Sequence, residues 1–150
     1  MPEKDQIFAH SANRFSRWHP LAEHLADVER LVGEFAAGFS WLDEAVLAAR
    51  CHDAGKAGLR FDDRLKGKEK GLDHWSIGAW IALTEGRSVA AALAIWGHHI
   101  GLQSADLNDL RALEPAKLAK SHPLKLRLTD DDPALTQDRF GRLVPNLSKI

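Results

Sequence analysis

The sequence predicts an all-α fold, and two observations support this. Apolar residues recur at spacings of three and four between positions 21 and 118, and most of these segments end near a glycine. No stretch shows the sustained alternation of apolar and polar residues typical of a half-buried strand. At 150 residues the chain suits one domain. We therefore expect a single helical domain over 1–150, with about five helices in a core over about 15–120 and an irregular tail over 121–150.

Two helices are expected in the first third of the chain. The first spans residues 20–38, because Pro20 suits the first helical position and apolar residues follow at helical spacing. Ser40 and Asp43 resemble a capping box that opens a second helix, which ends at about His52. Residues 60–70 carry many charges and are expected to form a loop or a short irregular helix.

Three more helices are expected downstream. They span about 73–85, 89–98 and 107–118, and Ser88 is placed to cap the second of these. Beyond residue 121 the periodic apolar pattern fades between prolines and a run of three aspartates, so this tail is expected to be weakly ordered.

Composition restricts the class of protein. The single cysteine, Cys51, has no partner for an internal disulfide and is interpreted as a small buried side chain, which favours a cytoplasmic location. The N-terminus lacks the pattern of a signal peptide, and no segment reaches the ~18 apolar residues of a membrane helix. The formal net charge of -1 neither favours nor excludes nucleic acid as a partner.

Histidines carry the main functional signal. Five of the eight, together with one aspartate, lie at the ends or inner faces of four successive expected helices. Each ring alone could be a hydrogen-bonded core residue, but two adjacent histidines beside glycines are hard to explain as core packing. Together the six side chains predict a shared metal site. They are His24, His52, Asp53, His74, His98 and His99.

Imidazole and carboxylate ligands suit Mn, Fe, Co, Ni or Zn, and Mg is possible. The absence of cysteine pairs argues against a structural zinc site. Six ligands exceed what one tetrahedral ion accepts. Two divalent ions roughly 3.5–4 Å apart, bridged by Asp53, would use all of them.

Four motifs carry a resemblance to a known family. HPLAEHL, HDAGK, DHWSIGA and WGHHIG, in this order, resemble the HD nuclease domain of type I CRISPR interference, over residues 15–105. The resemblance implies an HD-superfamily helical bundle and a metal-dependent hydrolase that cleaves single-stranded DNA as an endonuclease or exonuclease in antiviral defence. It also implies a CRISPR helicase, fused or separate, as partner, and through it the RNA-guided surveillance complex.

The resemblance also implies roles for individual residues. His24, His52 and Asp53 would ligate a first metal, Asp53 would bridge to a second completed by His74, His98 and His99, and Lys56 would be the catalytic lysine. Family members supply one further aspartate from a downstream helix. Here Asp106, Asp109, Asp130, Asp131, Asp132 and Asp138 do not fit that pattern. The expectation is that this chain is the front part of a longer domain, or that a neighbour or water fills the gap.

A comparison of the rate enhancements that different catalytic groups supply predicts a mechanism. General-base catalysis contributes typically 10²–10⁴-fold, too little for phosphodiester hydrolysis, whereas metal ions lower the pKa of bound water to about 7. We expect a hydroxide activated by two metals to attack phosphorus while Lys56 donates to a phosphate oxygen or the leaving group. A basic flank could guide the DNA backbone, or be a solvated loop. Its members are Arg60, Arg64, Lys66, Lys68 and Lys70.

Other residues receive no functional role. Trp75, Trp80 and Trp96 could stack bases but are better explained as core. His10, His19 and His122 show no ligand pattern.

Two alternatives stay open. The chain could be an HD phosphohydrolase acting on nucleotides or cyclic nucleotides, or a truncated, inactive HD docking module.

Overall fold

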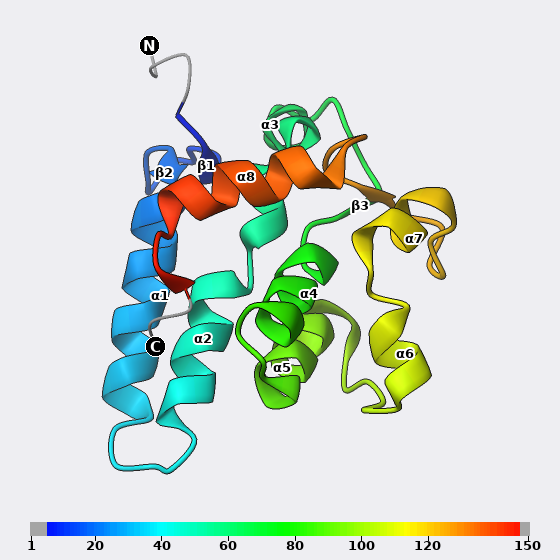
Figure 1. The fold of residues 1–150 in the computed structure, drawn as a ribbon. Helices are drawn as coiled ribbons and strands as arrows, with labels where there is room; N and C mark the ends of the chain where they lie inside the picture. The colour runs from blue at the N-terminus through cyan, green and yellow to red at the C-terminus, as the bar shows by residue number, and fades with distance from the viewer. Residues whose placement is uncertain (1–5, 148–150) are drawn as a thin grey trace.

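The computed structural model describes residues 6–147 and is mostly helical, which confirms the predicted class (Figure 1). The elements, in order, are β1 (Phe8–His10), β2 (His19–Pro20), α1 (Leu21–Phe35), α2 (Leu42–Cys51), the 3-10 helix η1 (Ala54–Ala57), α3 (Leu59–Leu65), β3 (Leu72–Asp73), α4 (Ser76–Thr84), α5 (Val89–Ile100), α6 (Leu107–Arg111), α7 (Pro115–Lys120), β4 (Arg127–Leu128) and α8 (Pro133–Leu143).

Helix α2 occupies the centre of the fold, where it contacts α1, α4 and α5 (Figure 1). The contact between α2 and α4 is unusually close, because a Cβ atom added at Gly78 would lie 1.9 Å from the carbonyl oxygen of Cys51. Cys51 itself is fully buried, and burial raises the pKa of its thiol to about 12, as expected of an inert core side chain. Small residues therefore set the spacing of the helices that carry the candidate site.

The helix boundaries agree with the capping residues expected from the sequence at some positions and differ from them at others. Ser88 caps α5 as predicted, since its hydroxyl accepts a hydrogen bond of 3.0 Å from the backbone N–H of Ala91. The capping box proposed at Ser40 is wrong, because α2 begins two residues later and its N-cap, Trp41, makes no side-chain cap hydrogen bond. The helix expected over 107–118 is interrupted, because Pro115 opens a new helix, α7.

The expectation of an irregular tail over 121–150 is wrong for its central part. Residues 133–143 form α8, which lies across η1 (Figure 1). Asp132 caps this helix by accepting from the backbone N–H of Ala134, and Pro133 takes the first turn. The buried residues on its inner face are Thr136 and Phe140. So short an apolar face leaves little periodicity in the sequence, and the aspartate that caps the helix lies within the run of three aspartates.

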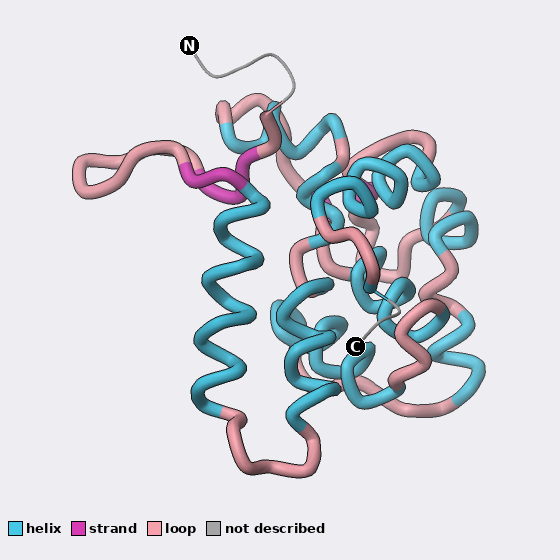
Figure 2. The backbone as a smooth tube through the Cα atoms, turned by 60° about the vertical axis from the view of Figure 1, so that its left-hand side comes forward, coloured by secondary structure: helices cyan, strands magenta, loops and turns pink. Residues whose placement is uncertain are grey.

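Two very small sheets were not predicted. β1 and β2 pair antiparallel with His10 opposite His19, and β3 and β4 pair in parallel. Strands of two or three residues are too short to show alternation in the sequence. Figure 2 shows the loop between β1 and β2 projecting from the body beside the start of α1. Within residues 6–147, no helix has the length and apolar character needed to cross a membrane.

Candidate metal centre

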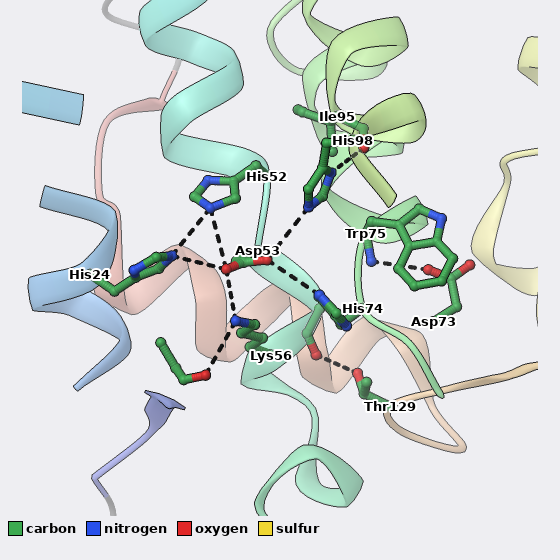
Figure 3. A network of polar contacts seen from close by, with 12 residues as sticks. His24, His52, Asp53, Lys56, Asp73, His74, Trp75, Ile95, His98 and Thr129 are labelled. Atoms are coloured by element: carbon green, nitrogen blue, oxygen red, sulfur yellow. Dashed lines mark hydrogen bonds and ion pairs between the residues drawn. The ribbon is translucent and has the colours of Figure 1, made fainter. Parts of the chain in front are cut away.

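Four helices bring the predicted ligands to one place. His24 comes from the first turns of α1, and His52 and Asp53 directly follow α2. His74 precedes α4, and His98 and His99 lie in the last turn of α5. Figure 3 shows His24, His52, His74 and His98 directed toward Asp53.

Glycine in the HDAGK motif makes this convergence possible. The backbone N–H of Gly55 donates a hydrogen bond of 3.0 Å to the carbonyl oxygen of His74. A Cβ atom at position 55 would lie 2.3 Å from that same oxygen, so any larger residue would separate the two segments. The glycine thus places His74 beside Asp53.

One oxygen of the Asp53 carboxylate faces two imidazoles and an ammonium. Asp53 Oδ2 lies 3.0 Å from His24 Nε2, 3.3 Å from His52 Nε2 and 2.9 Å from Lys56 Nζ. The two Nε2 atoms are 3.2 Å apart. Ligand atoms about 2.0–2.1 Å from a tetrahedral ion lie about 3.3–3.4 Å from one another. The triangle of His24, His52 and Asp53 therefore has nearly the dimensions of three ligands on one ion.

The other oxygen faces the second group of ligands. Asp53 Oδ1 lies 3.4 Å from His74 Nε2 and 3.9 Å from His98 Nε2. With His99, these residues offer ligand atoms that all lie within 4.8 Å of one another. A cluster of His and Asp that could hold a metal ion is therefore present, and Asp53 belongs to both of its groups.

Hydrogen bonds fix which nitrogen of two rings is free. His52 Nδ1 donates to the carbonyl oxygen of Ala49 at 2.7 Å, and His98 Nδ1 donates to that of Ile95 at 2.5 Å. A neutral ring that donates from Nδ1 keeps its lone pair on Nε2, which in both residues is the nitrogen facing Asp53. Backbone carbonyls are common outer partners of metal-binding histidines.

The ring of His74 gives a further indication that the cluster could hold a metal ion. Its Nε2 atom is buried and makes no well-formed hydrogen bond, although Asp53 Oδ1 lies 3.4 Å away; within the described part of the chain, Thr136 Oγ1 is likewise without one. Buried polar atoms are nearly always satisfied, and an unsatisfied one at a cluster of ligands suggests an ion. The donor set and this orphaned nitrogen both fit a borderline divalent ion.

The charge states of Asp53 and His99 also suit a metal site. Burial opposes ionisation of the Asp53 carboxyl, but hydrogen bonds from His24 and His52 prevail and hold its pKa well below the usual range. Burial, reinforced by the nearby rings of His74 and His98, lowers the pKa of His99 to about 4. The carboxylate is therefore ionised and the His99 ring is neutral at physiological pH, the forms in which both bind metals.

Lys56 occupies the position expected for a residue of the site. Its ammonium is buried, 2.9 Å from Asp53 Oδ2, and donates to the carbonyl oxygen of Ala9 at 3.2 Å. The residue thus ties η1 to both the carboxylate and β1.

The predicted DNA-binding residues lie on α3 and the turn that follows it, directly after η1. Arg60 is engaged with the carbonyl oxygen of Leu128 and the carboxylate of Asp131. Lys66 Nζ lies 2.6 Å from Asp62 Oδ2. Arg64, Lys68 and Lys70 are exposed. Their role in binding DNA stays a prediction.

The further aspartate of the family pattern does not appear in the described residues, whose metal-capable groups include no carboxylate except that of Asp53. The downstream aspartates serve other purposes. Asp130 Oδ2 lies 3.0 Å from Arg139 Nη1, and Asp106 and Asp132 cap α6 and α8.

Sequence reasoning missed three histidines. His10 and His19, which were given no ligand role, lie beside His24 and form a third metal-capable group with it. His122 pairs with Asp73 through its Nε2 atom at 2.7 Å. Asp73 Oδ1 accepts from the backbone N–H groups of Trp75 and Ser76, so this pair positions the segment that carries His74.

The predicted packing role of the tryptophans agrees with the structure. Trp75 is buried, and Trp80 and Trp96 pack against the core. Comparison of the chain with protein-family models, curated proteins and solved structures finds no match.

Proposed function

We propose that the chain is a metal-dependent phosphodiesterase that cleaves single-stranded DNA, an HD nuclease of the kind its motifs resemble. The observation that carries the proposal is the arrangement of five imidazoles in two groups around the buried carboxylate of Asp53. The spacing of His24, His52 and Asp53 matches that of ligands on one ion.

Two divalent ions, from among Mn, Fe, Co, Ni and Zn, with Mg possible, suit the two groups. Such ions supply Lewis-acid chemistry and make a water nucleophile available at neutral pH. His24 and His52 would hold one ion with Asp53 Oδ2, and His74, His98 and His99 the other with Asp53 Oδ1. The backbone bonds of His52 and His98 keep their rings oriented, so little reorganisation is needed.

Lys56 would stabilise charge on the substrate. An ammonium has three protons to donate, and two of those on Lys56 are directed to Asp53 and the carbonyl oxygen of Ala9. The third is available to a phosphate oxygen or a leaving group. A cavity of about 670 Å³ reaches Lys56 and is lined by three further cations, Lys66, Arg139 and Arg142. Each of these three cations is also paired with a carboxylate, so a phosphate backbone would bind here by competing with those ion pairs.

Aromatic residues beside the site favour a single strand over a mononucleotide. The loop between β1 and β2 borders a cavity of about 760 Å³, lined among others by Phe15, Arg17, Trp18 and His19. Phe15 is 82% exposed, and the guanidinium of Arg14 lies 4.4 Å from its ring centre. Exposed aromatic rings and arginines are the means by which proteins hold unpaired bases and their phosphates.

The remaining parts of the proposal rest on the resemblance of the motifs. They are a role in CRISPR-based antiviral defence, a cytoplasmic location, and association with a helicase and an RNA-guided surveillance complex. Binding of the chain to a helicase of this class in a pull-down with purified proteins would test the association directly.

The experiment that tests the activity compares wild type with Asp53→Asn and His52→Ala on labelled single-stranded DNA in the presence of Mn²⁺. Both variants should lose cleavage, because each removes a ligand of the same triangle. Asp109→Asn, an identical change at an exposed position, should cleave normally. Retained cleavage by Asp53→Asn would refute the assignment.

The same assay separates the alternatives. Faster hydrolysis of mononucleotides or cyclic nucleotides than of single-stranded DNA would indicate a nucleotide phosphohydrolase. An inactive wild type that binds at most one ion weakly, measured as metal per chain by mass spectrometry, would indicate a docking module.

A further inference from the structure

The third metal-capable group, made of imidazoles alone, lies at the edge of the Asp53 centre, where the β1–β2 hairpin meets α1. His10 ends β1, His19 begins β2 opposite it, and His24 lies in the first turns of α1. The ring centres are 4.9 Å apart for His10 and His24, 5.6 Å for His19 and His24, and 6.1 Å for His10 and His19. Each ring offers one nitrogen, and the three nitrogens lie within 4.8 Å of one another. We call this group the rim triad.

The backbone around the rim triad is firmly attached to the core. The N–H of Leu21, at the start of α1, donates to the carbonyl oxygen of Ile7 at 2.8 Å. Lys56 donates to the carbonyl oxygen of Ala9, and the Ala9 side chain is 1% exposed. Asn13 accepts two backbone hydrogen bonds within the loop, from Phe15 and Ser16. The proximity of the three rings is therefore a property of the fold and does not depend on a freely moving hairpin.

We propose that the rim triad is a further metal site, which shares only His24 with the Asp53 centre, is made of imidazoles alone and is selective for Zn²⁺, Cu²⁺, Ni²⁺ or Co²⁺. Neutral imidazoles suit these borderline ions, whereas Mg²⁺ and Mn²⁺ prefer oxygen ligands, which this group lacks. A carboxylate oxygen of Asp27 lies 3.5 Å from His19 Nε2. This is the kind of outer partner that orients a metal-binding histidine and increases its basicity.

Because the rim triad and the Asp53 centre share His24, an ion bound in one affects the binding of an ion in the other. His24 belongs both to the rim triad and to the group with His52 and Asp53. A neutral imidazole offers one lone pair to a metal, so His24 serves one ion at a time. An ion in the rim triad therefore removes a ligand from the first position of the Asp53 centre. The rim triad acts as a site at which zinc opposes loading of the neighbouring centre.

The test counts zinc in a background where the Asp53 centre is damaged, so its outcome does not depend on nuclease activity. Asp53→Asn removes the carboxylate shared by both central groups and leaves the rim triad intact. Zinc per chain is measured by mass spectrometry after equilibration with a Zn²⁺ buffer. We expect the Asp53→Asn/His19→Ala protein to hold one zinc per chain fewer than Asp53→Asn. Equal zinc contents would overturn the proposal.

A control variant and a substitute pair of variants complete the comparison. Asp53→Asn/Ser11→Ala changes a side chain of the same hairpin that is not in the triad, and it should keep the full zinc content of Asp53→Asn. A loss of zinc there equal to that of the His19 variant would overturn the proposal, since the loss would then come from the hairpin and not from the imidazole. Should Asp53→Asn fail to fold by circular dichroism, His52→Ala and His52→Ala/His19→Ala provide the same comparison and the same two outcomes.

Discussion

Replacement of Gly78 by alanine is expected to damage the metal centre through a helix contact. The new Cβ atom would lie 1.9 Å from the carbonyl oxygen of Cys51, whereas real Cβ contacts essentially never fall below 3.0 Å, so the backbones must separate by about 1 Å. Overpacking of this kind costs about 3 kcal/mol, which lowers the melting temperature by roughly 6–12 °C in a chain of this size. The same displacement moves His74 away from Asp53, and metal sites tolerate only about 0.2 Å.

Two measurements and a control test this reasoning. Urea unfolding without metal gives the change in the free energy of unfolding, and calorimetric titration with Mn²⁺ or Zn²⁺ gives the affinity. Gly33→Ala is the control, because a Cβ there meets nothing within 4 Å and the position lies inside α1. It should stabilise the protein by about 0.5–1 kcal/mol and leave metal binding unchanged. A Gly78→Ala protein with wild-type stability and affinity would refute the close contact.

Three further predictions concern the ions, a buried ion pair and the projecting loop. Zn²⁺ or Mn²⁺ at 100 times its dissociation constant should raise the free energy of unfolding by about 2.7 kcal/mol per site, seen as a higher melting temperature, and Asp53→Asn should show a much smaller rise. Burial opposes ionisation of Asp73, but hydrogen bonds from His122 and Ser76 prevail and lower its pKa. The stabilisation that these bonds give is therefore present above the unfolded pKa of about 3.9 and is lost as the pH falls through the pKa of the folded state. The stability difference between wild type and His122→Ala, from urea unfolding at several pH values, should therefore be largest near neutral pH and shrink below about pH 4; a constant difference would contradict the pairing. Phe15→Ala should weaken binding of single-stranded DNA by about 5–100-fold, measured by fluorescence anisotropy, with unchanged metal per chain.

The sequence predicts the position of a residue well where its local chemistry and its packing agree. HDAGK places two ligands at a helix end followed by glycine, and the structure brings these ligands together with His74 because Gly55 permits the approach. The serine cap of α5 was equally readable. In such segments each residue has a local reason for its place, so the pattern alone predicts the geometry.

Tertiary pairing accounts for most of what could not be predicted. His10 and His19 become neighbours through two very short strands, and nothing in the eight residues of the intervening loop indicates that register. The role of His122 depends on Asp73, which is 49 residues away in the chain. Helix α8 has two buried residues on its inner face, and its position is set by packing against η1. Long-range contacts of this kind leave almost no local periodicity.

Energetics favour metal binding over a purely structural role for the cluster. A buried carboxylate needs one compensating cation, and Lys56, 2.9 Å from Asp53 Oδ2, already provides it. Hydrogen bonds from His24 and His52 stabilise the same carboxylate, so five imidazoles around it are more than its charge requires. His74 leaves a buried nitrogen without a well-formed hydrogen bond, its facing acceptor being Asp53 Oδ1 at 3.4 Å, and an unsatisfied buried group costs about 1–3 kcal/mol. A ring that leaves a buried nitrogen poorly satisfied, yet lies at ligand spacing from one carboxylate, is explained when an ion binds that nitrogen. Measured stability of the metal-free protein should accordingly rise when His74 is replaced by leucine, while metal binding falls.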